Sequence, residues 1–179
     1  AVPQLVENLL APVKGIVGPW VHKYPHFAVP EPRIGFLQEA LRWWDKWLKG
    51  LETGVENDPA YSVYLMDGVR PQTWYEHRPG RWINEESWPN GPALKSMYLG
   101  QGNTLNTDST RINDILSSPQ TCGMSSGEYC AIWLGPEMPG DQRGDDALSL
   151  CYDSAPLSEE CDIVGAVKVN LRLLSDTSD

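Results

Sequence analysis

The chain has 179 residues, of which 41% are hydrophobic, and its 14 basic and 24 acidic groups give a net charge of −10. This apolar content is enough for a buried core, so a disordered acidic tail is excluded. Residues 101–179 contain 4 basic and 13 acidic groups. Because a phosphate backbone requires a clustered basic surface, we expect no nucleic-acid partner. No apolar run approaches the roughly 18 residues that a membrane-spanning helix needs, so we expect no membrane partner.

The four cysteines contain no C-x-x-C pair, and with three histidines elsewhere they do not match the spacing of a zinc site. We therefore expect neither a metal nor a cofactor. Four cysteines allow three disulfide pairings, but buried free thiols are the favoured interpretation. No secretory leader is visible, which favours the cytoplasm.

The first fifty residues predict a helix, a strand, a loop and a second helix, in that order. Apolar residues at helical spacing predict the end of a helix over residues 4–10, and a β-branched run between glycines predicts a strand over 14–18. Four prolines make residues 19–32 an extended loop. Residues 34–49 repeat apolar side chains every three or four positions, which predicts an amphipathic helix that stops at Gly50.

The sequence pattern changes after a linker at residues 52–60. Short runs of strand-forming residues alternate with turns, and they predict strands over 61–66, 94–99, 129–134, 147–152 and 167–174. The sequence therefore predicts a mixed fold. Residues 1–51 are expected to form the last strand-loop-helix unit of an α/β sheet, and residues 61–179 a mainly β sandwich of the jelly-roll kind.

His22 lies on the proline-rich loop directly after the first predicted strand. An α/β-hydrolase places its catalytic base at this position, and imidazole can move a proton near neutral pH. A histidine that simply binds a backbone carbonyl remains an alternative. A metal pair of His22 and His26 is disfavoured, because Pro25 interrupts the helix that would put both rings on one face.

Several segments together resemble the CocE/NonD hydrolases, the group of cocaine esterase, α-amino-acid ester hydrolases, glutaryl acylases and X-Pro dipeptidyl peptidases. Two stretches resemble the hydrolase domain: Gly18-Pro-Trp-Val-His-Lys-Tyr-Pro-His-Phe and the helix from Ile34 to Gly50. The family also has a C-terminal jelly-roll domain, of the X-Pro dipeptidyl-peptidase C-terminal-like and galactose-binding-like type. Four further segments resemble this domain: Gly80–Pro89, Pro139–Arg143, Asp145-Asp146 and Asp153–Leu157.

The resemblance implies a serine hydrolase that acts on small-molecule esters, amides or peptides, with His22 as the histidine of a Ser-His-Asp triad. Trp20 and Tyr24 flank His22 and are candidate substrate-binding residues. The chain contains no G-x-S-x-G motif, so the nucleophile is expected in a hydrolase segment that precedes Ala1, together with the acid. We therefore expect a truncated piece of a longer enzyme that is inactive alone.

The remaining aromatic and charged residues have simpler interpretations. Trp43, Trp44 and Trp47 could line a substrate pocket, but they are expected to pack against the sheet and the neighbouring domain. Arg143 is expected to pair with a carboxylate at a turn, and the acidic run at 159–162 to face solvent. An alternative function is a non-catalytic β-sandwich module that binds carbohydrate or peptide through the tryptophans Trp74, Trp82 and Trp88. Neither interpretation specifies an oligomeric state.

Overall fold

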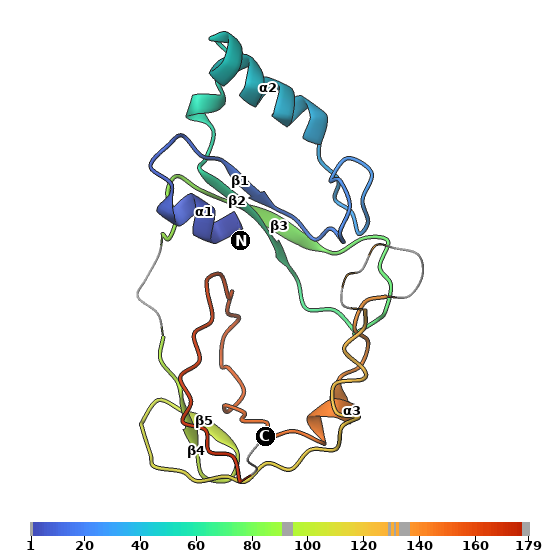
Figure 1. Cartoon of the computed structure of the whole chain (residues 1–179), viewed down its shortest axis with the longest axis vertical. Coiled ribbons are helices and arrows are strands. Elements are labelled where there is room, and N and C mark those ends of the chain that lie inside the picture. Colours follow the sequence, from blue (N-terminus) through green and yellow to red (C-terminus); the bar gives the residue numbers. More distant parts are fainter. Residues whose placement is uncertain (1, 91–94, 129, 131, 133–136, 177–179) are drawn as a thin grey trace.

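The computed structural model describes residues 2–90, 95–128, 130, 132 and 137–176. Two sheets and a few short helices make up this part of the chain (Figure 1). In chain order the elements are α1 (Val2–Asn8), β1 (Gly15–Val17), α2 (Phe36–Lys49), the 3-10 helix η1 (Val55–Asn57), β2 (Tyr61–Met66), β3 (Gly80–Glu85), β4 (Tyr98–Gly100), β5 (Thr104–Asn106) and α3 (Arg143–Asp146).

The larger sheet has the order β1-β2-β3. β1 runs parallel to β2, with Gly15 opposite Tyr61, and β2 runs antiparallel to β3, with Tyr64 opposite Trp82. The connection between the two parallel strands contains α2, as parallel neighbours require a crossover. This pairing joins strands from either side of the predicted linker 52–60. The division into two domains stays a prediction.

Helix α1 lies close against β1, and Gly15 permits this approach. A Cβ atom at Gly15 would lie 2.7 Å from Cγ2 of Val6 and 3.1 Å from Cδ2 of Tyr61. Val6 and Tyr61 are both buried, so this contact is one part of the small core. Ala28, Val55 and Tyr64 are buried as well, as is Pro19, and Pro30 is fully enclosed.

Helix α2 confirms the predicted helix and its end. Gly50 adopts a left-handed conformation with φ of 70°; its N–H donates to the Lys46 carbonyl, and the Leu51 N–H donates to the Asp45 carbonyl. The expected ion pair is present as well, with Lys49 Nζ 2.6 Å from Asp45 Oδ1. None of its residues is buried, however. Trp44 and Trp47 are 53% and 42% exposed, so the predicted packing against the sheet is wrong for these two, while their packing against a neighbouring domain stays a prediction.

After residue 60 the described residues form short strands and irregular segments, and α3 is the only helix among them. The antiparallel pair β4-β5 lies at the far end of the molecule from α2 (Figure 1). The predicted strand 61–66 is confirmed as β2. Of the described part of the predicted strand 94–99, only the last two residues belong to a strand, β4. The prediction over 129–134 falls largely outside the described residues. A β-rich second part is thus present, whereas a complete jelly-roll stays a prediction.

Two predicted strands are wrong. Residues 147–152 follow α3 in turns, and 167–174 run irregularly although their apolar residues alternate. Val167, Val169, Leu171 and Leu173 are each at least 55% exposed. A strand needs a neighbouring backbone to complete its hydrogen-bond ladder, and no described segment pairs with 167–174.

The prediction of buried thiols is wrong, although all four cysteines are free. Cys130 and Cys161 are exposed, whereas Cys122 and Cys151 are half-buried. The carboxylate pair at the turn is confirmed: Arg143 Nε lies 2.9 and 2.8 Å from the two carboxylate oxygens of Asp141. These hydrogen bonds from Arg143 lower the pKa of Asp141 to about 2. No helix within the described ranges is long and apolar enough to cross a membrane.

Candidate functional site

The loop that follows β1 holds His22 in an exposed position. The loop closes on itself where the Val21 N–H donates to the Val29 carbonyl at 3.1 Å. Arg33 strengthens it through a hydrogen bond from Nε to the Ala28 carbonyl at 2.9 Å. With Ala28 and Pro30 buried at the base of this loop, its backbone has few alternative conformations. The imidazole of His22 is therefore presented to solvent by an anchored segment.

Trp20 anchors this loop through a hydrogen bond and a ring contact. Its indole Nε1 donates to the Pro32 carbonyl at 2.7 Å, and its ring lies 6.1 Å from that of Trp82 on β3. A tryptophan fixed in this way contributes mainly apolar contact area. The structure gives Trp20 a clear packing contact, and its predicted substrate-binding role remains untested.

Tyr24 is 61% exposed and stacks on Phe36 with ring centroids 5.7 Å apart. His26 lies parallel to Phe36 at 6.0 Å, and its Nδ1 is buried without a hydrogen-bond partner in the structure. The part of the chain that the structure describes contains no group of three or more His, Cys, Asp and Glu side chains able to hold a metal ion. Tyr24 and His26 thus belong to one aromatic cluster beside the start of α2.

Cys130 is the residue that the structure adds to this site. Its Sγ lies 3.2 Å from Nδ1 of His22, a hydrogen-bond distance for a thiol and an imidazole. Both side chains are exposed. In a Ser-His-Asp triad, Nδ1 is the nitrogen that binds the acid, while Nε2 faces the serine. In this structure a thiol contacts that nitrogen. Because 108 residues separate the two, no spacing in the sequence could have indicated the pair.

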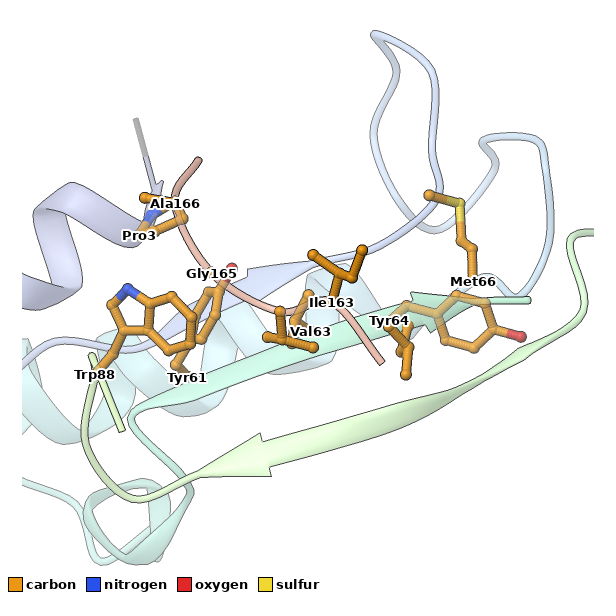
Figure 2. Close-up of a pocket in the computed structure, with 11 residues that line it drawn as sticks. Pro3, Tyr61, Val63, Tyr64, Met66, Trp88, Ile163, Gly165 and Ala166 are labelled. Carbon is orange, nitrogen blue, oxygen red and sulfur yellow. The ribbon is translucent and has the colours of Figure 1, made fainter. Parts of the chain in front are cut away.

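A second site is an apolar cavity of about 360 Å³ on β2. Tyr61 and Trp88 stand at one end with ring centroids 4.7 Å apart, and Met66 lies at the other (Figure 2). The C-terminal segment crosses the strand between them, with Ile163 above Val63 (Figure 2). A concave apolar site with aromatic walls is typical of ligand pockets.

The three tryptophans of the predicted binding module do not share this cavity. Trp88 lines it, whereas Trp82 packs against the Tyr64 ring at 5.2 Å and against Trp20. Trp74 is 43% exposed on the connection between β2 and β3. Of the three, Trp88 is therefore the one placed to contact a molecule bound in the cavity.

Comparison with known proteins identifies the family to which this chain belongs. Residues 53–179 match the family described as "X-Pro dipeptidyl-peptidase C-terminal non-catalytic domain". Two curated proteins named "Putative serine esterase", from Mycobacterium bovis and Mycobacterium tuberculosis, are each 26% identical to this chain over 175 residues. The aligned region is 92% of this chain and 26% of each relative, so the chain spans about a quarter of their length. No solved structure matches. Since the family match includes well over half of the residues, the chain belongs to the X-Pro dipeptidyl-peptidase C-terminal non-catalytic domain family.

Proposed function

We propose that this chain is the C-terminal part of a serine hydrolase and that His22 is its general base. The observation that supports the proposal best is the exposed imidazole on an anchored loop that follows strand β1. The chain covers about a quarter of its curated relatives, which are named as serine esterases. The catalytic activity accordingly belongs to the whole protein, and the chain alone is inactive.

The proposed division assigns residues 1–51 to the end of an α/β-hydrolase domain and residues 61–179 to a jelly-roll domain. The family match begins at residue 53, inside the linker 52–60, which supports this division. All four cysteines are free, as is usual in a reducing compartment, and the cytoplasm is the compartment we propose.

The proposed reaction is acyl transfer to a serine of the preceding hydrolase segment. His22 takes the hydroxyl proton at Nε2 as the serine oxygen attacks the carbonyl carbon of an ester, amide or X-Pro dipeptidyl bond. The imidazolium then gives this proton to the leaving alcohol or amine. Water, deprotonated by the same nitrogen, hydrolyses the acyl-serine and restores both groups. In the productive state an acid binds Nδ1, which requires His22 to exchange its contact with Cys130 for a carboxylate.

The test compares His22→Gln with His77→Gln in the full-length protein. His77 is another exposed histidine, and its backbone forms a β-bridge with Glu31 at the end of the His22 loop, so its replacement removes an imidazole while this backbone pairing stays available. We expect His22→Gln to lower kcat for p-nitrophenyl ester hydrolysis by at least about 100-fold, as loss of a general base does, and His77→Gln to leave it unchanged. Equal kcat values for the two variants would remove His22 from the mechanism.

A binding module remains a second candidate, because the cavity beside Tyr61 and Trp88 is apolar and has aromatic walls. On this hypothesis a sugar ring or an apolar peptide side chain stacks on Trp88. Titration calorimetry of the full-length protein with a panel of monosaccharides and short peptides tests it. Binding that Trp88→Ala abolishes and Trp74→Ala preserves would support the module, and the absence of any binding would eliminate it.

A further inference from the structure

The thiol of Cys130 and the imidazole of His22 form a chemically competent pair that the proposed hydrolase mechanism does not use. The 3.2 Å separation of Sγ and Nδ1 allows a proton to pass directly between them. Both groups are exposed, so a small reagent can reach the sulfur without displacing other side chains.

The thiolate form of cysteine is the nucleophile, and an adjacent base makes it available as the reaction proceeds. The sequence alone does not indicate this base, because no histidine lies near Cys130 along the chain. We propose that Cys130 is a reactive thiol, activated by His22, which is modified by soft carbon electrophiles.

The modification step balances without any further reagent. The Cys130 S–H proton moves to Nδ1 of His22 while sulfur attacks the electrophilic carbon. A carbon–sulfur bond forms, and the leaving group departs with its electron pair, as iodide does from iodoacetamide. The resulting thioether lies against the ring that the proposed hydrolase uses as its base, so modification would also inhibit ester hydrolysis. This inhibition rests on the proposed function, whereas the thiol reactivity rests on the state in which Nδ1 of His22 contacts Cys130 rather than the acid of the proposed triad.

Cys161 provides an internal control within the same molecule. It is the other exposed cysteine, and the contact described for its Sγ is the carbonyl of the adjacent Asp162 at 3.6 Å. The half-buried Cys122 and Cys151 bind backbone carbonyls as well, and Cys122 also lies 3.4 Å from the Ser149 hydroxyl. Among the described contacts of the four cysteines, only that of Cys130 is with a titratable base.

The experiment measures alkylation of each cysteine in the native full-length protein by limiting iodoacetamide at pH 7, followed by peptide mass spectrometry. An unactivated thiol is only a few per cent thiolate at this pH, so we expect Cys130 to react roughly tenfold faster than Cys161. His22→Gln should reduce the Cys130 rate to that of Cys161 while the Cys161 rate stays constant. Equal rates in the unmodified protein, or a Cys130 rate that His22→Gln leaves unchanged, would overturn the proposal.

Lys23 offers a second variant that distinguishes a base from a nearby positive charge. It follows His22 directly, so its ammonium could favour a thiolate by charge alone. Lys23→Gln should leave the rate ratio of Cys130 to Cys161 unaltered, and loss of the ratio in this variant would contradict activation by His22. The two proposals fail separately. If Cys130 reacts fast in the parent protein and slowly in His22→Gln, while His22→Gln keeps full esterase activity, the hydrolase role alone is refuted.

Discussion

At the scale of single residues, the position of the His22 loop depends on how closely Trp20 covers Gly18. A Cβ atom at Gly18 would lie 2.6 Å from the six-membered ring of Trp20. The indole cannot move aside freely, because Nε1 is bound to the Pro32 carbonyl and the ring packs against Trp82. A side chain at Gly18 would therefore disturb the base of the loop that presents His22.

We predict that Gly18→Ala destabilises the protein by about 1–3 kcal/mol, the usual cost of overpacking a contact that cannot relax. The measurement is the midpoint of urea unfolding of the full-length protein at constant m value.

Gly144 is the matched control. It lies in α3, and a Cβ atom there meets nothing within 4 Å. Because this position is open, Gly144→Ala should change the free energy of unfolding by no more than about 0.5 kcal/mol. If Gly18→Ala were as well tolerated as Gly144→Ala, the Trp20 ring would not be fixed over Gly18.

A residue of the candidate site can be predicted from the sequence only when the residues that indicate its role lie close to it in the chain. His22 could be singled out because a strand, a proline-rich loop and a helix surround it in consecutive residues. Cys130 could not, since its contact with His22 joins segments 108 residues apart. Trp20 and Tyr24 were correctly placed beside His22 in the chain, but their ring contacts with Trp82 and Phe36 depend on tertiary packing.

At the scale of elements, a cluster of ion pairs fixes α2 to the chain on either side of it. Asp58 accepts two hydrogen bonds from the Arg42 guanidinium, at 3.0 and 3.1 Å, and also pairs with Lys14 just before β1. Lys14 Nζ lies 2.7 Å from Glu39 on α2 as well. Partial burial raises the pKa of Asp58, but hydrogen bonds from Arg42 and Lys14 outweigh it and the pKa is lowered overall.

We predict that Asp58→Asn lowers the free energy of unfolding by about 1.5–3 kcal/mol at pH 7, the range for hydrogen bonds to charged groups. A carboxylate with a lowered native pKa stabilises the fold above its unfolded-state pKa of about 3.9 and loses this effect as the pH falls through the native value. The difference between the parent protein and Asp58→Asn should therefore shrink below about pH 4. Urea unfolding at pH 7, 5 and 3 measures it.

Asp45→Asn serves as the control, because Asp45 pairs with Lys49 one turn away on the same helix. Surface pairs of this kind contribute about 0.3–0.5 kcal/mol. An Asp58→Asn cost no larger than that of Asp45→Asn would mean that the cluster does not fix α2.

The elements that sequence analysis predicted correctly are those with a complete local signal. β1, α2 and β2 have glycine or proline boundaries and a clear apolar pattern, and all three are present. β3 was missed because Gly80–Glu85 alternates charged, polar and aromatic residues, and its partner β2 determines its pairing. Residues 167–174 have the pattern of a strand and lack a described partner, so pattern alone was misleading there.

At the scale of the whole molecule, the chain exposes more surface than a compact protein of its size. Its accessible surface is 13991 Å². A folded monomer of 20.0 kDa is expected to expose about 8,700 Å², so the observed area is about 1.6 times larger. Among the exposed large apolar side chains are those of 167–174 and one stripe of α2. Such surfaces are usually covered in a protein's functional state.

The stripe on α2 consists of Leu37, Leu41, Trp44 and Leu48, each at least 53% exposed. The neighbouring stripe, with Phe36, Ala40 and Trp43, lines a cavity of about 290 Å³ shared with Ile16 and Trp20 near β1. One side of α2 therefore faces β1, and the adjacent side is left without a partner among the described residues. On the proposed function, the preceding hydrolase segment of the same polypeptide covers it, since the relatives are about four times as long as the aligned region.

We predict that Leu41→Asp destabilises the full-length protein by at least about 2 kcal/mol, because it would place a carboxylate in the contact where, on the proposed function, the hydrolase segment covers this leucine. Gln38→Asp is the matched control, since Gln38 is exposed on α2 outside the stripe and such surface changes stay within about 0.5 kcal/mol. The free energies of unfolding of both variants, measured in urea, test this prediction. A Leu41→Asp protein as stable as Gln38→Asp would mean that the stripe faces solvent in the whole enzyme, and the hydrolase segment would then have to contact a different surface of this chain.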